Sequence, residues 1–135
     1  MIVIKSTCSV FVDVDETLIL WNWKDYTEDI TGLISITDPK SGVSEYGLPH
    51  QRHIDLIRQF KARGHTVVIW SAGGAEWAER AVKALGIEKM VDAVLAKPNW
   101  YVDDLPAAAY MKKPIYLHPM NPLKDERAQG IDDED

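Results

Sequence analysis

Two aspartates separated by one residue follow an apolar run near the start of the chain. The run at residues 8–14 is rich in β-branched side chains, Asp13 and Asp15 lie at its end, and Thr17 follows them. Two nearby carboxylates repel each other and lose hydration at a buried strand end, so this pairing needs a compensating charge. A divalent cation would provide that charge. We therefore expect a functional site where this strand ends.

Short apolar segments alternate with amphipathic ones along the chain. Runs rich in β-branched residues predict strands, and apolar residues that recur every three or four positions predict helices. This alternation is typical of an α/β fold with a parallel sheet and right-handed crossovers. Strands are predicted at 8–14, 65–70, 91–95, 100–102 and 114–117, and helices at 49–63, 75–85 and 105–110.

Polar residues follow three of these predicted strands. Asp13 ends the first strand, Ser71 follows the second, and Asp103 and Asp104 follow the one at 100–102. Ligands of parallel α/β sheets bind beyond the carboxyl ends of the strands, so these residues are expected to converge on one edge of the sheet. Lys97 precedes the aspartate pair and is expected to join the same site.

These residue types suit phosphoryl transfer, which needs a nucleophile, a proton donor and positive charge around the phosphate. Asp13 can attack phosphorus to form an aspartyl phosphate. Asp15 can protonate the leaving oxygen and later deprotonate the attacking water. Carboxylate oxygens suit Mg²⁺, which would share the charge of the transferring group with Lys97. Ser71 precedes a glycine-containing turn into a predicted helix, where backbone amides favour an anion.

The order and spacing of these residues resemble the four motifs of the haloacid dehalogenase (HAD) superfamily. The resemblance extends over about residues 8–117, and all four motifs occur in order on predicted elements of the right kind. Glu16 departs from the glycine often found at that place, which acidic residues occupy in some members. The matching segments are 10–18 for the first motif, 69–71 for the second, 97–98 for the third and 101–104 for the fourth.

The resemblance implies a role for each matching residue, and a second aspartate at position 15 marks the phosphatase and phosphomutase branch of the family. The backbone carbonyl of Asp15 would also bind the metal, and Asp104 would reach it directly or through water. The implied roles are catalysis for Asp13 and Asp15, phosphate binding for Ser71 and Lys97, loop support for Thr17, and Mg²⁺ binding for Asp13, Asp15, Asp103 and Asp104.

The resemblance also implies the architecture, a three-layer Rossmann-like parallel sheet with helices on both faces. About fifty residues separate Thr17 from Ser71, and the predicted helix and strand there use about twenty of them. The remainder fits a flap hairpin at 32–47, with a turn-rich tip near Lys40, and leaves no room for a cap domain. We expect a capless member in which this flap is the local gate.

Composition bounds the remaining expectations. The 135 residues suggest one domain at 1–123 and an acidic, disordered tail at 124–135. The net charge is −6, and the tail's six acids and two bases account for −4 of it, which argues against tight non-specific nucleic-acid binding. Cys8 is the single cysteine, and the sequence lacks a signal-peptide pattern or membrane span, so we expect a cytoplasmic protein. The sequence leaves the oligomeric state open.

The leading expectation is a Mg²⁺-dependent phosphomonoester hydrolase acting on a small molecule or a macromolecular end. Trp21, Trp23 and Trp100 lie near the expected site and could stack a base, which slightly favours a nucleotide or a 3′-phosphate nucleic-acid end. Trp21 and Trp23 could equally pack the flap against the core. The alternatives are a phosphoprotein or sugar-phosphate phosphatase, a non-enzymatic phospho-acceptor signalling module, and a binding domain without turnover. His50 and His53 are expected at the surface.

Overall fold

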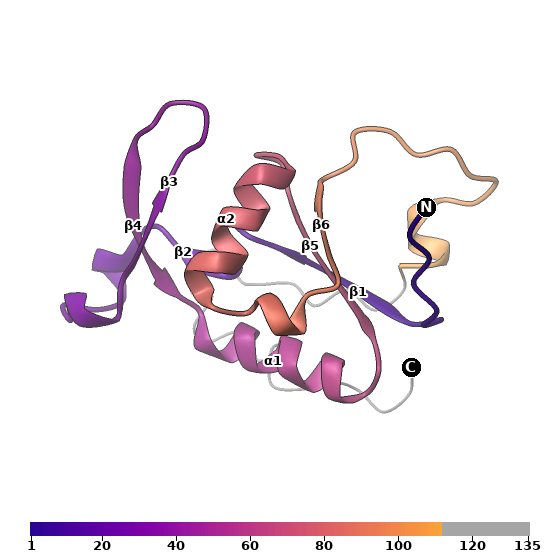
Figure 1. Ribbon diagram of the computed structural model, residues 1–135, viewed down its shortest axis with the longest axis horizontal. Helices are drawn as coiled ribbons and strands as arrows, with labels where there is room; N and C mark the ends of the chain where they lie inside the picture. Colours follow the sequence, from indigo (N-terminus) through magenta and orange to yellow (C-terminus); the bar gives the residue numbers. More distant parts are fainter. Residues whose placement is uncertain (112–135) are drawn as a thin grey trace.

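The computed structural model describes residues 1–111, which form an α/β unit with two α-helices and six strands (Figure 1). Glycines with positive φ angles flank the second helix, with φ of 105° at Gly74 and 70° at Gly86, so the helix begins and ends where the sequence predicts. The elements are β1 (Ser9–Asp13), β2 (Ile19–Leu20), η1 (Trp23–Asp25), η2 (Ile30–Gly32), β3 (Ile34–Thr37), β4 (Ser44–Pro49), α1 (Gln51–Ala62), β5 (Thr66–Ser71), α2 (Ala75–Leu85), η3 (Glu88–Met90), β6 (Ala93–Ala96) and η4 (Ala107–Ala109).

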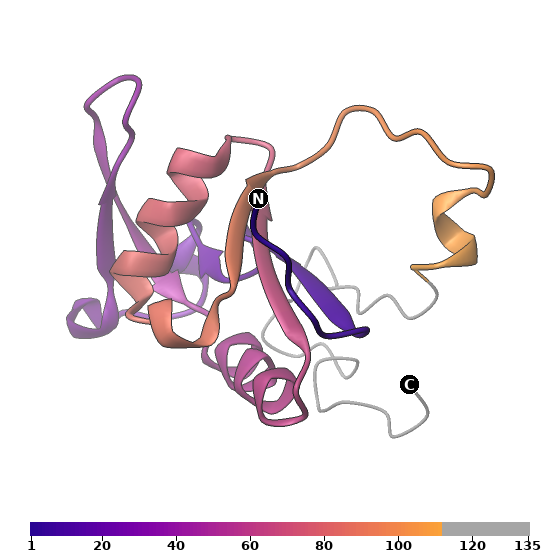
Figure 2. The same ribbon diagram turned by 45° about the vertical axis from the view of Figure 1, so that its right-hand side comes forward.

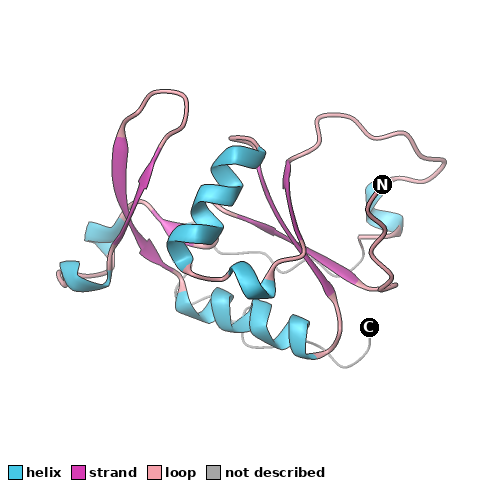
Figure 3. Cartoon of the chain, in the orientation of Figure 1, coloured by secondary structure: helices cyan, strands magenta, loops and turns pink. Residues whose placement is uncertain are grey.

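A parallel sheet in the order β1-β5-β6 forms the centre of the molecule. Each successive strand of this sheet is added on the same side of the one before it. Right-handed crossovers that follow this order place their helices on the same face of the sheet. Buried residues of α1 and α2 accordingly form one cluster with Val67 and Ile69 of β5. Figure 3 shows the two helices, in cyan, next to the magenta strands of this sheet. The parallel α/β fold is thus confirmed, and among residues 1–111 the α-helices cover one face of the sheet.

The predicted strand at 100–102 is wrong. These residues have no regular secondary structure, and the exposed fractions of Trp100 and Val102 are 89% and 103%. After β6 the segment 97–106, drawn in orange, arches away from the sheet in both Figure 1 and Figure 2. A three-residue apolar run forms a strand only where a neighbouring strand pairs with it, and none lies beside this segment among the described residues. The helix predicted at 105–110 shortens to the 3-10 turn η4.

The flap predicted at 32–47 is confirmed as the antiparallel hairpin of β3 and β4. The other edge of β4 pairs with the two-residue strand β2. We use "flap" for this hairpin. Gly47 makes the packing possible, because a Cβ at this position would collide with Ile19 and lie 3.0 Å from the Trp21 ring. The flap therefore rests directly on the segment that follows β1. The predicted strand at 114–117 and the domain boundary at 123 lie outside the described residues.

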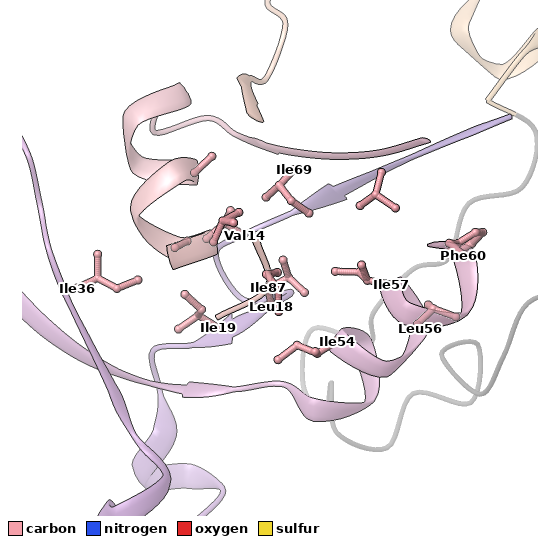
Figure 4. Close-up of a cluster of buried hydrophobic side chains, with 14 residues drawn as sticks. Val14, Leu18, Ile19, Ile36, Ile54, Leu56, Ile57, Phe60, Ile69 and Ile87 are labelled. Carbon is pink, nitrogen blue, oxygen red and sulfur yellow. The ribbon is translucent and has the colours of Figure 1, made fainter. Parts of the chain in front are cut away.

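The hydrophobic core lies between the parallel sheet, the two helices and the turn after β1 (Figure 4). Val14, Leu18 and Ile19 of that turn are fully buried, and Ile36 of the flap is 3% exposed. Burying such side chains contributes about 1.5–3 kcal/mol each. Because the turn carries core residues as well as Asp15 and directly follows Asp13, core packing fixes the position of both candidate catalytic aspartates. No helix among residues 1–111 has the length and apolar character needed to cross a lipid bilayer.

Asp92 ties three elements together ahead of β6. Its carboxylate accepts a hydrogen bond from the Val67 amide at 2.7 Å and lies 2.7 and 2.9 Å from the Lys61 ammonium of α1. The hydrogen bond from Lys61 is the largest cause that holds the pKa of Asp92 below its usual value, and the Val67 amide adds to it. The folded state therefore favours the ionised carboxylate.

We predict that Asp92→Asn lowers the free energy of unfolding by about 1 kcal/mol at pH 7. Because the pKa of Asp92 is lower in the folded than in the unfolded state, this stabilisation is present above about pH 4 and is lost as the pH falls through the folded-state pKa. Urea denaturation at pH 7 and pH 3 would measure it. Asp55→Asn is the control, since the Asp55–Arg58 pair is exposed, and equal losses in both variants would contradict the role of Asp92.

Candidate active site

Three neighbouring strands bring Asp13, Ser71 and Lys97 to one edge of the parallel sheet. Asp13 is the last residue of β1 and Ser71 the last residue of β5. Lys97 follows β6, and its amide donates to the Ser71 carbonyl at 2.9 Å. The shared edge is a consequence of parallel pairing, in which all carboxyl ends point the same way.

The Asp13 carboxylate has a cation and a hydroxyl beside it. Lys97 Nζ lies 3.3 Å from Asp13 Oδ1, and Thr17 Oγ1 donates to Asp13 Oδ2 at 3.1 Å. The exposed fractions of the Lys97 and Asp13 side chains are 43% and 31%, so a ligand can reach both. Thr17 is expected to steady the loop around Asp15, and its hydroxyl also holds the Asp13 carboxylate. The result is an accessible, oriented carboxylate next to a positive charge.

A tight turn carries the chain from Asp13 to the core. The Val14 carbonyl accepts hydrogen bonds from the amides of Thr17, Leu18 and Ile19 at 3.1, 2.9 and 3.2 Å. Glu16 adopts a φ of 62°, in the left-handed region that glycine occupies at little cost. This conformation explains physically why glycine would suit position 16. Glu16 gains in return a hydrogen bond, because its Oε1 accepts from the Trp21 amide at 3.1 Å.

Three donors hold the Asp15 carboxylate. Trp21 Nε1 donates to Oδ1 at 2.9 Å, and Trp77 Nε1 lies 3.1 Å from Oδ1 and 3.3 Å from Oδ2. Ser71 Oγ donates to Oδ2 at 3.4 Å. The two indole rings lie side by side, with centroids 5.8 Å apart. An indole N–H can only donate, so both tryptophans require an acceptor oxygen on Asp15.

The turn between β5 and α2 fits closely around Ser71. Ser71 is fully buried, and its Oγ accepts from the Gly73 amide at 3.0 Å while it donates to Asp15. A Cβ on Gly73 would lie 3.1 Å from Trp77 Cδ1, so glycine lets the indole approach the turn. The described contacts therefore sort into two groups. Thr17 and Lys97 hold Asp13, whereas Ser71 and the two indoles hold Asp15.

Asp103 and Asp104 lie in the exposed segment 97–106 that leaves the sheet. The Leu105 amide donates to Asp103 at 3.0 Å, which holds the pKa of that carboxyl below its usual value. Within residues 1–111, no three acidic, histidine or cysteine side chains are close enough to hold one metal ion. Carboxylate oxygens suit Mg²⁺ by their chemistry, but this conformation does not assemble the predicted ligands, Asp13, Asp15, Asp103 and Asp104.

Sequence reasoning missed the indole donors to Asp15 and the support that a histidine gives to the turn. His53 Nδ1 lies 2.6 Å from the Thr17 carbonyl and donates to it, since a carbonyl oxygen only accepts. The surface positions expected for His50 and His53 are wrong, because the exposed fractions are 0% and 3%. Positions 50, 53, 54 and 57 share one helical face, and this spacing could have revealed the burial. No pattern in the sequence links the tryptophans to Asp15.

Comparison of the chain with models of protein families, with curated proteins and with solved structures gives no match. The resemblance to the HAD superfamily therefore rests on the residues of the four motifs and on their order along the chain.

Position 16 offers a test of the turn that carries Asp15. We predict that Glu16→Ala lowers the free energy of unfolding by about 1 kcal/mol, because alanine keeps the unfavourable φ and loses the bond to the Trp21 amide. Glu16→Gly is expected to lie close to the parent protein, since glycine relieves the φ cost. Urea denaturation of both variants would measure this, and equal stability of the two variants would contradict a left-handed residue 16.

Proposed function

We propose that this chain is a Mg²⁺-dependent phosphomonoester hydrolase that works through an aspartyl phosphate. The observation that supports it best is the partly exposed Asp13 carboxylate, with Lys97 at 3.3 Å and Thr17 at 3.1 Å, at the carboxyl edge of a parallel sheet. Asp15, two residues further on, supplies the second carboxyl group that the reaction needs. The substrate is a phosphorylated small molecule or macromolecular end.

In the first step, an Asp13 carboxylate oxygen attacks phosphorus, the bond from phosphorus to the ester oxygen breaks, and Asp15 gives a proton to the departing alcohol. In the second step, water attacks the phosphorus of the aspartyl phosphate and Asp15 takes the proton back. Inorganic phosphate leaves and Asp13 is regenerated. The Lys97 ammonium beside Asp13 offsets the negative charge of the group being transferred.

The donors around Asp15 bear on its role as acid and base. Ser71 Oγ can donate to a carboxylate and can also accept from a protonated carboxyl group, whereas the two indoles can only donate. All three donors approach from residues outside the turn at 14–19. These donors orient Asp15 independently of Asp13. Separate orientation suits a mechanism in which Asp15 donates the proton and Asp13 is the nucleophile.

Mg²⁺ belongs to the proposal because of donor chemistry and the sequence motifs, and it would supply positive charge at the transferring phosphate. Among residues 1–111 the predicted ligands Asp13, Asp15, Asp103 and Asp104 do not come together, and the two steps of the proposed reaction use the carboxyl groups of Asp13 and Asp15. A chelator should abolish the activity. Activity that persists with chelator present would remove the metal from the proposal and leave the roles of Asp13 and Asp15 to be tested separately.

A three-layer fold is part of the same proposal. Phe11 and Trp70 contact each other on the sheet face opposite the helices, with ring centroids 4.6 Å apart, and Phe11 is 40% exposed. An apolar face of a parallel sheet is ordinarily covered, which supports a second layer on this side.

We predict that Asp13→Asn lowers the rate of phosphate release from an aryl phosphate by about 1,000-fold or more, because the amide is a poor nucleophile. Released phosphate would be assayed with Mg²⁺, and circular dichroism would check that the fold persists. Asp25→Asn is the control, since Asp25 is exposed in η1. A parent-like rate in Asp13→Asn would remove Asp13 from its role.

Trp77→Phe tests the orientation of Asp15. Phenylalanine keeps an aromatic ring but removes the N–H donor, so kcat should fall roughly tenfold for an ester with a poor leaving group. An activated aryl ester should be affected less, because it needs little proton donation. Trp70→Phe is the matched control, since Trp70 packs on Phe11. An equal loss for both esters would indicate that Trp77 does not act through Asp15.

A further inference from the structure

A cleft of about 360 Å³ lies between the tip of the flap and the beginning of α2, and Asp15 forms part of its wall. Arg80 of α2 donates to the Thr37 carbonyl of β3 at 3.3 Å, which joins the two sides below the tip. Figure 1 shows the flap rising beside α2. The lining residues are Asp15, Asp38, Lys40, Ser41, Val43, Glu45, Gly73 and Trp77.

Strand register places Glu45 on the inner side of the flap. Glu45 pairs with Ile36 across the hairpin, and directly opposed residues of antiparallel strands share a face. Ile36 is 3% exposed and belongs to the core, so its face of the flap is turned inward. The next pair, Thr37 and Ser44, lies on the other face by the same register, and Glu45 itself is exposed near the tip of the flap. Glu45 therefore extends into the cleft from the face that otherwise packs on the core.

The cleft is acidic. Three of its lining residues are carboxylates and one is a lysine. Asp38 accepts hydrogen bonds from the Lys40 amide and the Ser41 hydroxyl, and the bond from the Lys40 amide is the largest cause that lowers the pKa of Asp38. The Lys40 ammonium can balance the charge of one of the three carboxylates. Asp15 is the proton donor of the proposed reaction, so Glu45 is the carboxylate of the cleft that stays negative, and Trp77 gives the wall an aromatic surface.

We propose that this cleft receives the leaving group of the phosphomonoester and selects a planar alcohol that carries a positive charge. This inference rests on the proposed function, because it places the alcohol next to Asp15, its proton donor. A cation is attracted both by the face of an indole ring and by the Glu45 carboxylate. A further anionic group on the alcohol is repelled by Glu45, which disfavours nucleic-acid ends as substrates.

Three aryl phosphates with similar leaving groups test the charge preference: phenyl phosphate, 4-(2-aminoethyl)phenyl phosphate and 3-(4-phosphonooxyphenyl)propanoate. We expect kcat/KM to be about tenfold higher for the amine than for the carboxylate at low ionic strength, with phenyl phosphate between them. The spread should narrow as salt is added. A carboxylate ester that reacts as fast as the amine ester would overturn the proposal.

Glu45→Gln then assigns the preference to the cleft. The ratio of kcat/KM for the amine to that for phenyl phosphate should fall several-fold in this variant. Glu88→Gln is the matched control, because Glu88 is exposed in η3, beyond the opposite end of α2, and it should keep the parent ratio. An unchanged ratio in Glu45→Gln would overturn the cleft as the selecting element. Absence of hydrolysis for all three esters would instead refute the proposed function itself, so the two failures are distinguishable.

Discussion

The parallel pairing of β1 with β5 is the constraint on which the candidate site depends. Its register places Asp13 opposite Trp70, one residue before Ser71, and the next ladder places Ser71 opposite Ala96, one residue before Lys97. A slip of one residue would turn the partly buried Val10 and Val12 away from the core. The hydrophobic cost of that slip fixes the register. Core packing therefore sets the distance between the candidate nucleophile and its cation, although neither residue belongs to the core.

Elements with strong local signals could be predicted from the sequence, and elements that exist only through pairing could not. The helix α2 has an apolar stripe and a glycine at each end, so the predicted boundaries at 75 and 85 match the structure. The strand β2 has two residues and forms because β4 lies beside it. The wrong prediction of a strand at 100–102 also follows from the need for a pairing partner. An apolar run was available there, but among the described residues no partner strand accompanies it.

The candidate site divides in the same way. Asp13, Ser71 and Lys97 could be predicted to meet, because strand order and the shared direction of parallel strands determine their positions. The contacts of Asp15 could not, because they depend on how the flap and α2 close around the turn at 14–19. Trp21 can reach Asp15 because Gly47 packs closely against β2 and the Trp21 ring. Trp77 can reach Asp15 because Gly73 leaves room for its ring in the turn after Ser71. Such contacts arise from tertiary packing, which leaves no fixed spacing in the sequence.

The environment of Asp15 links the proposed proton transfer to the walls of the cleft. Both carboxylate oxygens accept hydrogen bonds from groups on separate elements, Trp21 after β2 and Trp77 on α2. A carboxyl oxygen that carries a proton is a poor hydrogen-bond acceptor. A protonated Asp15 would therefore lose part of its contact with at least one indole, unless its O–H group donates to Ser71 Oγ. A substrate that fills the cleft lies against the same Trp77 ring. In the proposed reaction, leaving-group binding and proton transfer at Asp15 would therefore both involve the Trp77 side chain.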